Sequence, residues 1–290
     1  MGVKSGAEAH RARTSANGPY SGELSKSLAY MPRPVREFVI EAGGMASLLL
    51  RVVWSAVAHP RGYWSDTVDH LHTTIRKSWF PVVVAVLGFS MFMALLTTVF
   101  FQMVGAEQLT GPTLFVYMLR NFSMWTISMV SAGVVGAAIT ADIGSRKVRE
   151  ELDAMQVLGI DPVRELAVPR VVSVALFTAI LTIPAAYMTL FSLQLGTLYV
   201  AGLHPADFYE GTFGSVLPVD LISLVINGLL VGLLIGTICC YKGFAASGGS
   251  MGLGKAVNQA VVICFVAIFV FLIGYQAVLI AFFPEYGFQL

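Results

Sequence analysis

Long apolar runs alternate with short polar segments along most of this chain. Five of these runs are long enough to cross a bilayer, whose hydrocarbon core takes about 20 helical residues. They are residues 80–104, 122–143, 166–200, 218–241 and 257–283. The third is too long for one straight crossing at about 1.5 Å per residue, and Pro169 and Pro184 are expected to bend it. The pattern predicts an all-α integral membrane protein with five transmembrane helices.

Residues 35–58 form a further helical segment with a different pattern. A narrow polar stripe recurs at helical spacing, opposite an apolar face. The stripe consists of Glu37, Glu41, Gly44, Arg51 and Ser55. This pattern favours an amphipathic helix in the membrane interface, and a sixth spanning helix with buried polar contacts is the alternative. Residues 1–30, rich in Gly, Ser and Ala, are interpreted as a disordered tail before a single domain at 31–290.

Residues 59–79 are polar and are interpreted as a solvated connector before the first span, with Trp64 and Trp79 suited to the membrane interface. His70 and His72 also lie here, near two aspartates. Residues two apart do not share a helical face, so a metal site is the less favoured interpretation of these side chains.

Positive charge separates the two sides of the predicted membrane domain. With five spans, the N-terminal region and segments 144–170 and 242–255 share one side, which holds every Lys and Arg except Arg120. Cytoplasmic loops carry an excess of such residues. The pattern therefore predicts a cytoplasmic N-terminus and an extracytoplasmic C-terminus. Arg120 and Asp220, near the outer ends of the second and fourth spans, are the ionisable candidates for function.

Composition narrows the possible functions. Of the 290 residues, 12% are charged, against about 25% in ordinary soluble domains. The net charge is +1 and no basic stripe is present, so nucleic acid is not expected as a partner. The three cysteines lack the spacing of a disulfide framework or a zinc site. No catalytic residue and no metal ligand is predicted.

The segment between the second and third spans is the most informative. Residues 147–158 consist largely of good helix formers. Their apolar stripe is Val148, Leu152, Met155 and Leu158. Gly159 fits a helix stop, while Asp161 and Pro162 fit the N-cap and first position of the next helix. A helix this charged does not lie in lipid, so it is either a connector on the headgroups or a docking helix for a soluble protein.

Residues 249–255 read GSMGLGK and match the beginning of a phosphate-binding loop. Position 256 is Ala, so the hydroxyl group that would bind magnesium is missing. The segment also joins two predicted spans instead of a strand and a helix. We expect no nucleotide site here, and interpret the glycines as a tight cytoplasmic turn. These glycines are Gly243, Gly248, Gly249, Gly252 and Gly254.

Two segments resemble the signatures of one known family. They are EELDAMQVLGIDP at residues 150–162 and YKGFAASGGSMGLGKAVNQAVV at residues 241–262. Both are similar to motifs of the MlaE/YrbE permeases, in the family's order, and weaker similarity covers residues 35–283. Within this family, the chain is identified as a YrbE protein of an actinobacterial Mce system, and its departures from the family pattern favour a heterodimer. Arg120 matches the Arg of the family's R-E-L-G-P stretch, whose Glu, Gly and Pro are absent here.

The resemblance implies the permease subunit of an ABC-type lipid transporter in the inner (plasma) membrane. It implies a second permease chain, as homodimer or heterodimer, a cytoplasmic ATPase that binds ATP and Mg, and MCE-domain proteins. The cargo would be a phospholipid, fatty acid or sterol, with Arg120 as the lipid-pathway candidate, and no cofactor is expected in this chain. The residues implied in coupling to the ATPase are Glu150, Glu151, Asp153, Met155, Leu158, Gly159, Asp161 and Pro162. A secondary transporter or a membrane-embedded lipid-modifying enzyme is the alternative.

Overall fold

Residues 33–58, 62–106, 110–202 and 204–283, which the computed structural model describes, contain helices and no strands. Six helical stretches among them are long and apolar enough to cross a membrane. They are Val39–Ala58, Trp64–Met103, Thr113–Val148, Val163–Val200, Pro218–Phe244 and Gly249–Phe282. The last five correspond to the five spans expected from the sequence. The all-α membrane fold is therefore confirmed.

Helix α3 (Arg33–Ala58) is the segment for which the sequence leaves two locations open. Its residues Val39–Ala58 are long and apolar enough to cross a membrane. An interfacial helix can have the same length and hydropathy, so these properties do not decide between the two locations. The chain divides into two units, and the larger one begins at Leu48. Within that unit, Leu48 and Val52 are buried in the same apolar cluster as Ile143. The interfacial location of α3 stays a prediction.

Helix α4 (Trp64–Met103) includes most of the segment interpreted from the sequence as a connector. Residues 64–79 are helical and continue without interruption into the first span, and their solvated location stays a prediction. A regular row of buried side chains begins at Ser78 and continues along the span. The buried members at every fourth position are Ser78, Val82, Val86, Ser90, Ala94 and Thr98. This row allows close packing against the third span, where Ala94 lies against Gly196.

The second span is a continuous helical path with two π-helical turns. It comprises α5 (Thr110–Tyr117), the π turn η2 (Met118–Phe122), α6 (Ser123–Ser131), the π turn η3 (Ala132–Gly136) and α7 (Ala137–Val148). Such turns insert an extra residue into an α-helix and are frequent at functional sites. The first one carries Arg120.

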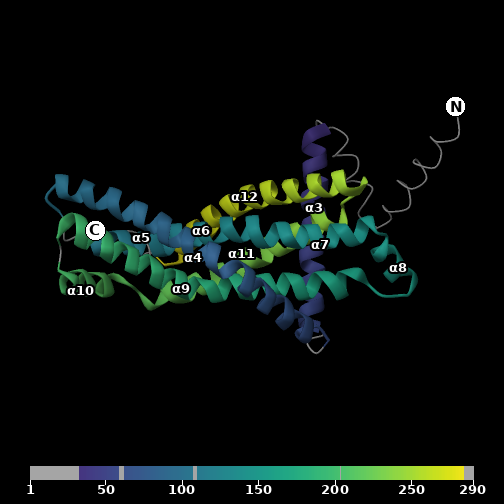
Figure 1. Ribbon diagram of the computed structural model, residues 1–290, viewed down its shortest axis with the longest axis horizontal. Coiled ribbons are helices and arrows are strands. Elements are labelled where there is room, and N and C mark those ends of the chain that lie inside the picture. The colour runs from purple at the N-terminus through teal and green to yellow at the C-terminus, as the bar shows by residue number, and fades with distance from the viewer. Residues whose placement is uncertain (1–32, 59–61, 107–109, 203, 284–290) are drawn as a thin grey trace. The chain divides into compact units, whose positions relative to one another are not determined.

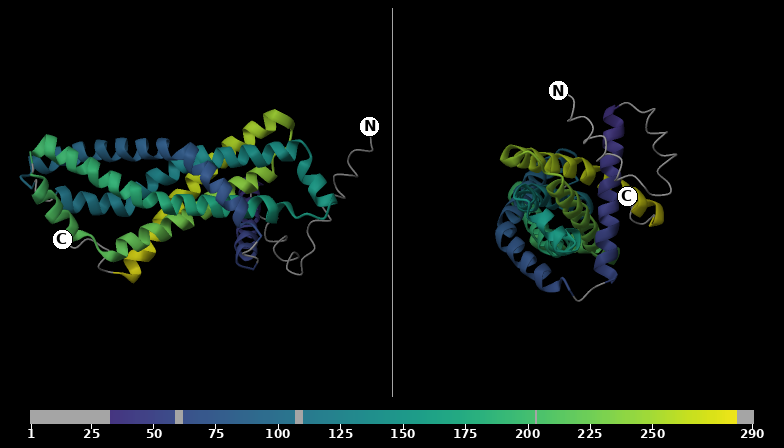
Figure 2. Two further views of the ribbon diagram at one scale, coloured as in Figure 1. Left: turned by 60° about the horizontal axis from the view of Figure 1, so that its bottom comes forward. Right: turned by 90° about the vertical axis from the view of Figure 1, so that its right-hand side faces the viewer.

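The remaining helices complete the larger unit. They are α8 (Glu151–Val157), the π turn η4 (Val163–Ala167), α9 (Val168–Ala201), α10 (Pro205–Ser215), α11 (Pro218–Phe244) and α12 (Gly249–Phe282). Helix α9 is central and packs against both α4 and α11. Helix α8 lies at one end of this unit and α10 at the other, in Figure 1 and in the left view of Figure 2.

Three glycines of α11 allow its close approach to α9. Gly228, Gly232 and Gly236 repeat every four residues, and each faces backbone atoms of α9. A Cβ atom added to Gly232 would overlap the Thr178 hydroxyl and lie 2.5 Å from the Cα atom of Ala175. The Thr178 hydroxyl also donates a hydrogen bond to the Gly228 carbonyl at 2.7 Å. The repeat therefore serves packing within the chain.

We expect Gly232→Ala to lower the free energy of unfolding by about 1–3 kcal/mol, because the backbone of α9 has to move away. Gly274→Ala in α12 is the matched control, since nothing lies within 4 Å of a Cβ atom there. Thermal unfolding of both variants in the same detergent measures the difference. Equal midpoints would contradict the packing described for α11 and α9.

Candidate functional site

The chain turns sharply between the second and third spans, and this corner differs from the predicted helix over 147–158. Lys147 and Val148 end α7, and α8 contains only Glu151–Val157. Between them, Glu150 has a φ of 61°, the left-handed conformation that residues other than Gly rarely adopt. The predicted continuous helix is therefore broken at Arg149 and Glu150, while Lys147 and Val148 are helical within α7. Because neither Gly nor Asn stands at the break, the sequence carries no signal of it.

The far end of α8 has the features expected from its sequence. Gly159 has a φ of 76° and its N–H group donates to the Gln156 carbonyl at 3.0 Å. The Ile160 N–H group donates to the Met155 carbonyl at 3.0 Å, which completes the Schellman arrangement of a helix end. The Asp161 carboxylate then accepts a hydrogen bond from the Val163 N–H group at 3.0 Å. The corner thus has a defined exit into η4.

The apolar stripe of the predicted helix divides into an inner and an outer part. Leu152 is 2% exposed in the buried cluster that includes Ile143 and Leu166, and Met155 packs against that cluster. By contrast, Val157 is 87% and Leu158 is 76% exposed, and Ile160 is also exposed. We call these three side chains the tip patch. Val157 is the last residue of a helix that Leu152 anchors, Leu158 and Ile160 follow that helix, and all three lie beyond the spans. Exposed apolar side chains that gather in this way mark interaction surfaces.

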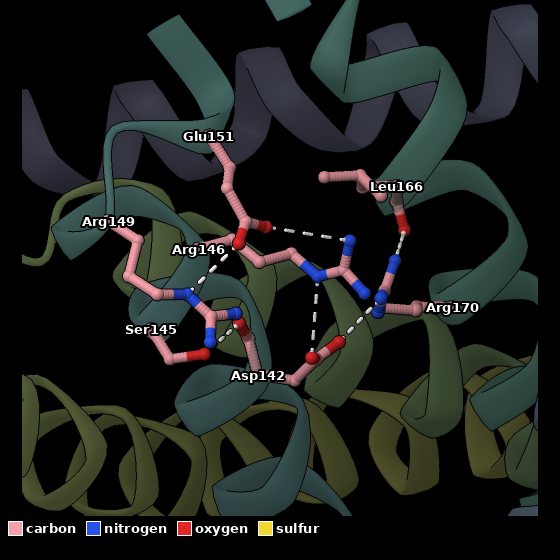
Figure 3. A network of polar contacts seen from close by, with 7 residues as sticks. All are labelled: Asp142, Ser145, Arg146, Arg149, Glu151, Leu166 and Arg170. Atoms are coloured by element: carbon pink, nitrogen blue, oxygen red, sulfur yellow. Dashed lines mark hydrogen bonds and ion pairs between the residues drawn. The ribbon is translucent and has the colours of Figure 1, made fainter. Parts of the chain in front are cut away.

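The acidic residues of α8 are paired within the chain, and Figure 3 shows the contacts of Glu151. The Glu151 carboxylate lies 3.0 Å from Arg149 Nε and 3.9 Å from Arg146 Nη1. Asp153 lies 2.7 Å from the Lys147 ammonium group. The sequence suggested these carboxylates as contacts for a partner. In the structure they hold α8 against the end of α7, and their contact with a partner stays a prediction.

A second pair, which sequence reasoning missed, continues this network into the third span (Figure 3). Arg170 is 4% exposed, and its Nη2 atom donates to the Asp142 carboxylate at 2.5 Å. Its Nη1 atom donates to the Leu166 carbonyl at 2.8 Å. Arg146 Nε lies 3.4 Å from the same Asp142 carboxylate. Ionic contacts therefore run from Glu151 of α8, through α7, to the beginning of α9.

The glycine-rich segment joins α11 to α12 at the same end of the unit as α8. Gly248 and Gly249 have φ values of 90° and 71°, so the turn itself depends on their conformational freedom. Gly243 lies against Ile143 of α7, and a Cβ atom at Gly252 would overlap the Ser247 carbonyl. Gly254 has open space around it. A turn between two helices differs from a phosphate-binding loop, which follows a strand.

Arg120 and Asp220 form one ion pair near the other end. Arg120 Nε donates to Asp220 Oδ1 at 2.8 Å and Nη2 donates to Oδ2 at 3.2 Å. Their side chains are 11% and 0% exposed. Asp220 also accepts a hydrogen bond from the Leu217 N–H group at 2.9 Å, which caps α11. The two candidates from the sequence thus act as a unit that joins η2 to α11, and a lipid contact of Arg120 stays a prediction.

Comparison with known proteins gives a consistent result. The family model described as Permease MlaE matches residues 67–277. A probable ABC transporter permease protein of Rickettsia prowazekii is 30% identical over 76% of this chain and 85% of its own length. A probable ABC transporter permease protein of Synechocystis is 32% identical over 57% of this chain and 63% of its own length. The chloroplastic protein TRIGALACTOSYLDIACYLGLYCEROL 1 of Arabidopsis thaliana is 28% identical over 72% of this chain and 59% of its own length. The chain therefore belongs to the MlaE permease family of ABC-type transporters.

Proposed function

We propose that this permease moves a lipid across or out of the inner (plasma) membrane, driven by a separate cytoplasmic ATPase that docks on α8. The tip patch is the observation that carries the docking proposal, because its side chains are exposed at the end of an anchored helix, beyond the spans. ATP and Mg would bind to the ATPase. The Gly159 and Asp161 corner then connects the docked helix to the third span.

A lipid cargo is supported by family membership and by the Arabidopsis relative, whose name is that of a galactolipid. The phospholipid, fatty acid and sterol classes all agree with spans that hold few ionisable groups. In the most hydrophobic 18-residue stretch of each span, 22% of the residues of α12 and 28% of those of α4 are buried, against 78% in the span that contains α9. Their apolar surfaces leave room for lipid and for a second permease chain, identical or related. MCE-domain proteins are the further partners that the family resemblance implies.

Charge supports a cytoplasmic location for the end that carries α8. Segments 105–121 and 201–217 contain Arg120 as their only Lys or Arg, and Arg120 pairs with Asp220. The positive residues at the α8 end include Arg146, Lys147, Arg149, Arg164, Lys242 and Lys255. An excess of Lys and Arg in cytoplasmic segments is the general rule.

Cysteine labelling tests this orientation. Gln156 of α8 and Glu210 of α10 are both exposed, and the three native cysteines are buried. We expect Glu210→Cys to react with a membrane-impermeant maleimide in intact cells, and Gln156→Cys to react only after the membrane is permeabilised. The reverse pattern, or reaction of both in intact cells, would contradict the proposed topology.

Purification of the chain from its native membrane in mild detergent tests the function itself. Mass spectrometry should identify a chain with ATP-binding-cassette motifs in stoichiometric amount, and the purified complex should hydrolyse ATP. A secondary transporter or a lipid-modifying enzyme would purify without such a chain. Purification of the permease without any ATPase, under conditions that keep it folded, would contradict the proposal.

A further inference from the structure

Helix α8 is joined to the spans through two sharp turns. It is only seven residues long, and left-handed residues flank it, Glu150 on one side and Gly159 on the other. A short helix between two such turns can pivot when force is applied, unless side chains hold it. Leu152 supplies one buried anchor. Met155 packs against the same buried cluster, and the ion pairs of Glu151 and Asp153 hold α8 to α7.

The Asp142 carboxylate is the centre of the longer of these ionic connections. It accepts from Arg146, which faces Glu151 of α8, and from Arg170 of α9. Arg170 in turn holds the Leu166 carbonyl, so its guanidinium joins three elements: α7, η4 and α9. Hydrogen bonds between ionised groups are shorter and stronger than neutral ones and fix their geometry. The second and third spans are therefore tied together where α8 leaves them.

We propose that Asp142 and Arg170 are positioning residues that transmit movement of α8 to the second and third spans together. This inference rests on the proposed function, since it requires a docked ATPase. Helix α8 is held to α7 by its own ion pairs, and the Asp142–Arg170 pair ties α7 to α9, so displacement of α8 moves the ends of α7 and α9 as one body. Without the pair, α8 still moves the end of α7, but the beginning of α9 does not follow, and ATP hydrolysis continues with little movement of the third span.

The measurement is the number of lipid molecules transferred per ATP hydrolysed, in the complete complex reconstituted in vesicles with a fluorescent phospholipid. Asp142→Asn keeps the size of the side chain and removes its charge. We expect the ATPase to co-purify and hydrolysis to continue, while the ratio of transfer to hydrolysis falls about fivefold or more, the lower end of typical coupling effects. Asp142→Glu should recover most of the ratio, because the carboxylate can reach Arg170 again.

Two further variants separate transmission from a purely structural role. Arg146→Gln breaks the connection at a side chain that is 37% exposed, so it should fold even where Asp142→Asn does not, and it should also lower the ratio. Glu165→Gln removes an equal charge from an exposed position in η4 and should leave the ratio unchanged. Normal ratios in both Asp142→Asn and Arg146→Gln would overturn the inference. If Asp142→Asn does not fold, the ratio of Arg146→Gln alone decides.

The two proposals fail in distinguishable ways. If the unaltered permease purifies without an ATPase or transfers no lipid with ATP, the proposed function fails. If the unaltered complex transfers lipid and the variants retain its ratio, the function stands and only the role of Asp142 and Arg170 is refuted.

Discussion

Replacing Val157 and Leu158 together with Glu is expected to abolish co-purification of the ATPase while the permease still enters the membrane. Both side chains are almost fully exposed and take no part in the buried cluster around Leu152, so the fold should persist. A carboxylate at the centre of an apolar contact loses its hydration without gaining a counter-ion. Uncompensated charges at interfaces weaken binding by about 2–5 kcal/mol.

The control is Gln156→Glu, which adds a charge to an exposed position of the same helix without removing an apolar side chain. It should retain the ATPase. Affinity purification from membranes, with the ATPase quantified relative to the permease, compares the variants. Undiminished capture by the double Glu variant would show that α8 is a connector and that the ATPase binds elsewhere.

Arg120→Met is expected to destabilise the permease by about 3–5 kcal/mol, because it leaves the buried carboxylate of Asp220 without its partner. The Asp220 side chain is fully shielded from solvent, and its only other hydrogen bond described is to the Leu217 N–H group. Adding Asp220→Asn should restore most of the lost stability, since the amide oxygen still caps α11 and no charge remains. Thermal unfolding of the two single variants and the double variant in detergent gives the coupling energy. A stable Arg120→Met variant would contradict the structural role of this pair.

Much of the fold could be predicted from the sequence, because span length and hydropathy are properties of a continuous segment. The five spans, the exit of α8 at Gly159 and the cap at Asp161 all depend on residues close together in the chain. The helical start of α4 was not predicted. Polar residues at its beginning suggested a connector, although the helix continues from them into the span and Ser78 begins its packing row.

The charged contacts could not be predicted in the same way. Arg120 and Asp220 are 100 residues apart, and Asp142 and Arg170 are 28 apart, so their pairing depends on how the helices assemble. The sequence analysis singled out Arg120, but as a residue that contacts lipid and not as the partner of Asp220. The left-handed conformation of Glu150 could not be predicted either, because the residue types around it favour a continuous helix.

ATP-driven lipid movement in vesicles tests the central claim most directly. The permease and its co-purified partners would be reconstituted with a quenchable fluorescent phospholipid, and transfer followed before and after ATP and Mg are added. We predict transfer that requires ATP and stops when the permease carries Glu at positions 157 and 158. Transfer at the same rate without ATP, or ATP-driven transfer that is unaffected by those two substitutions, would contradict the claim that an ATPase drives this permease through α8.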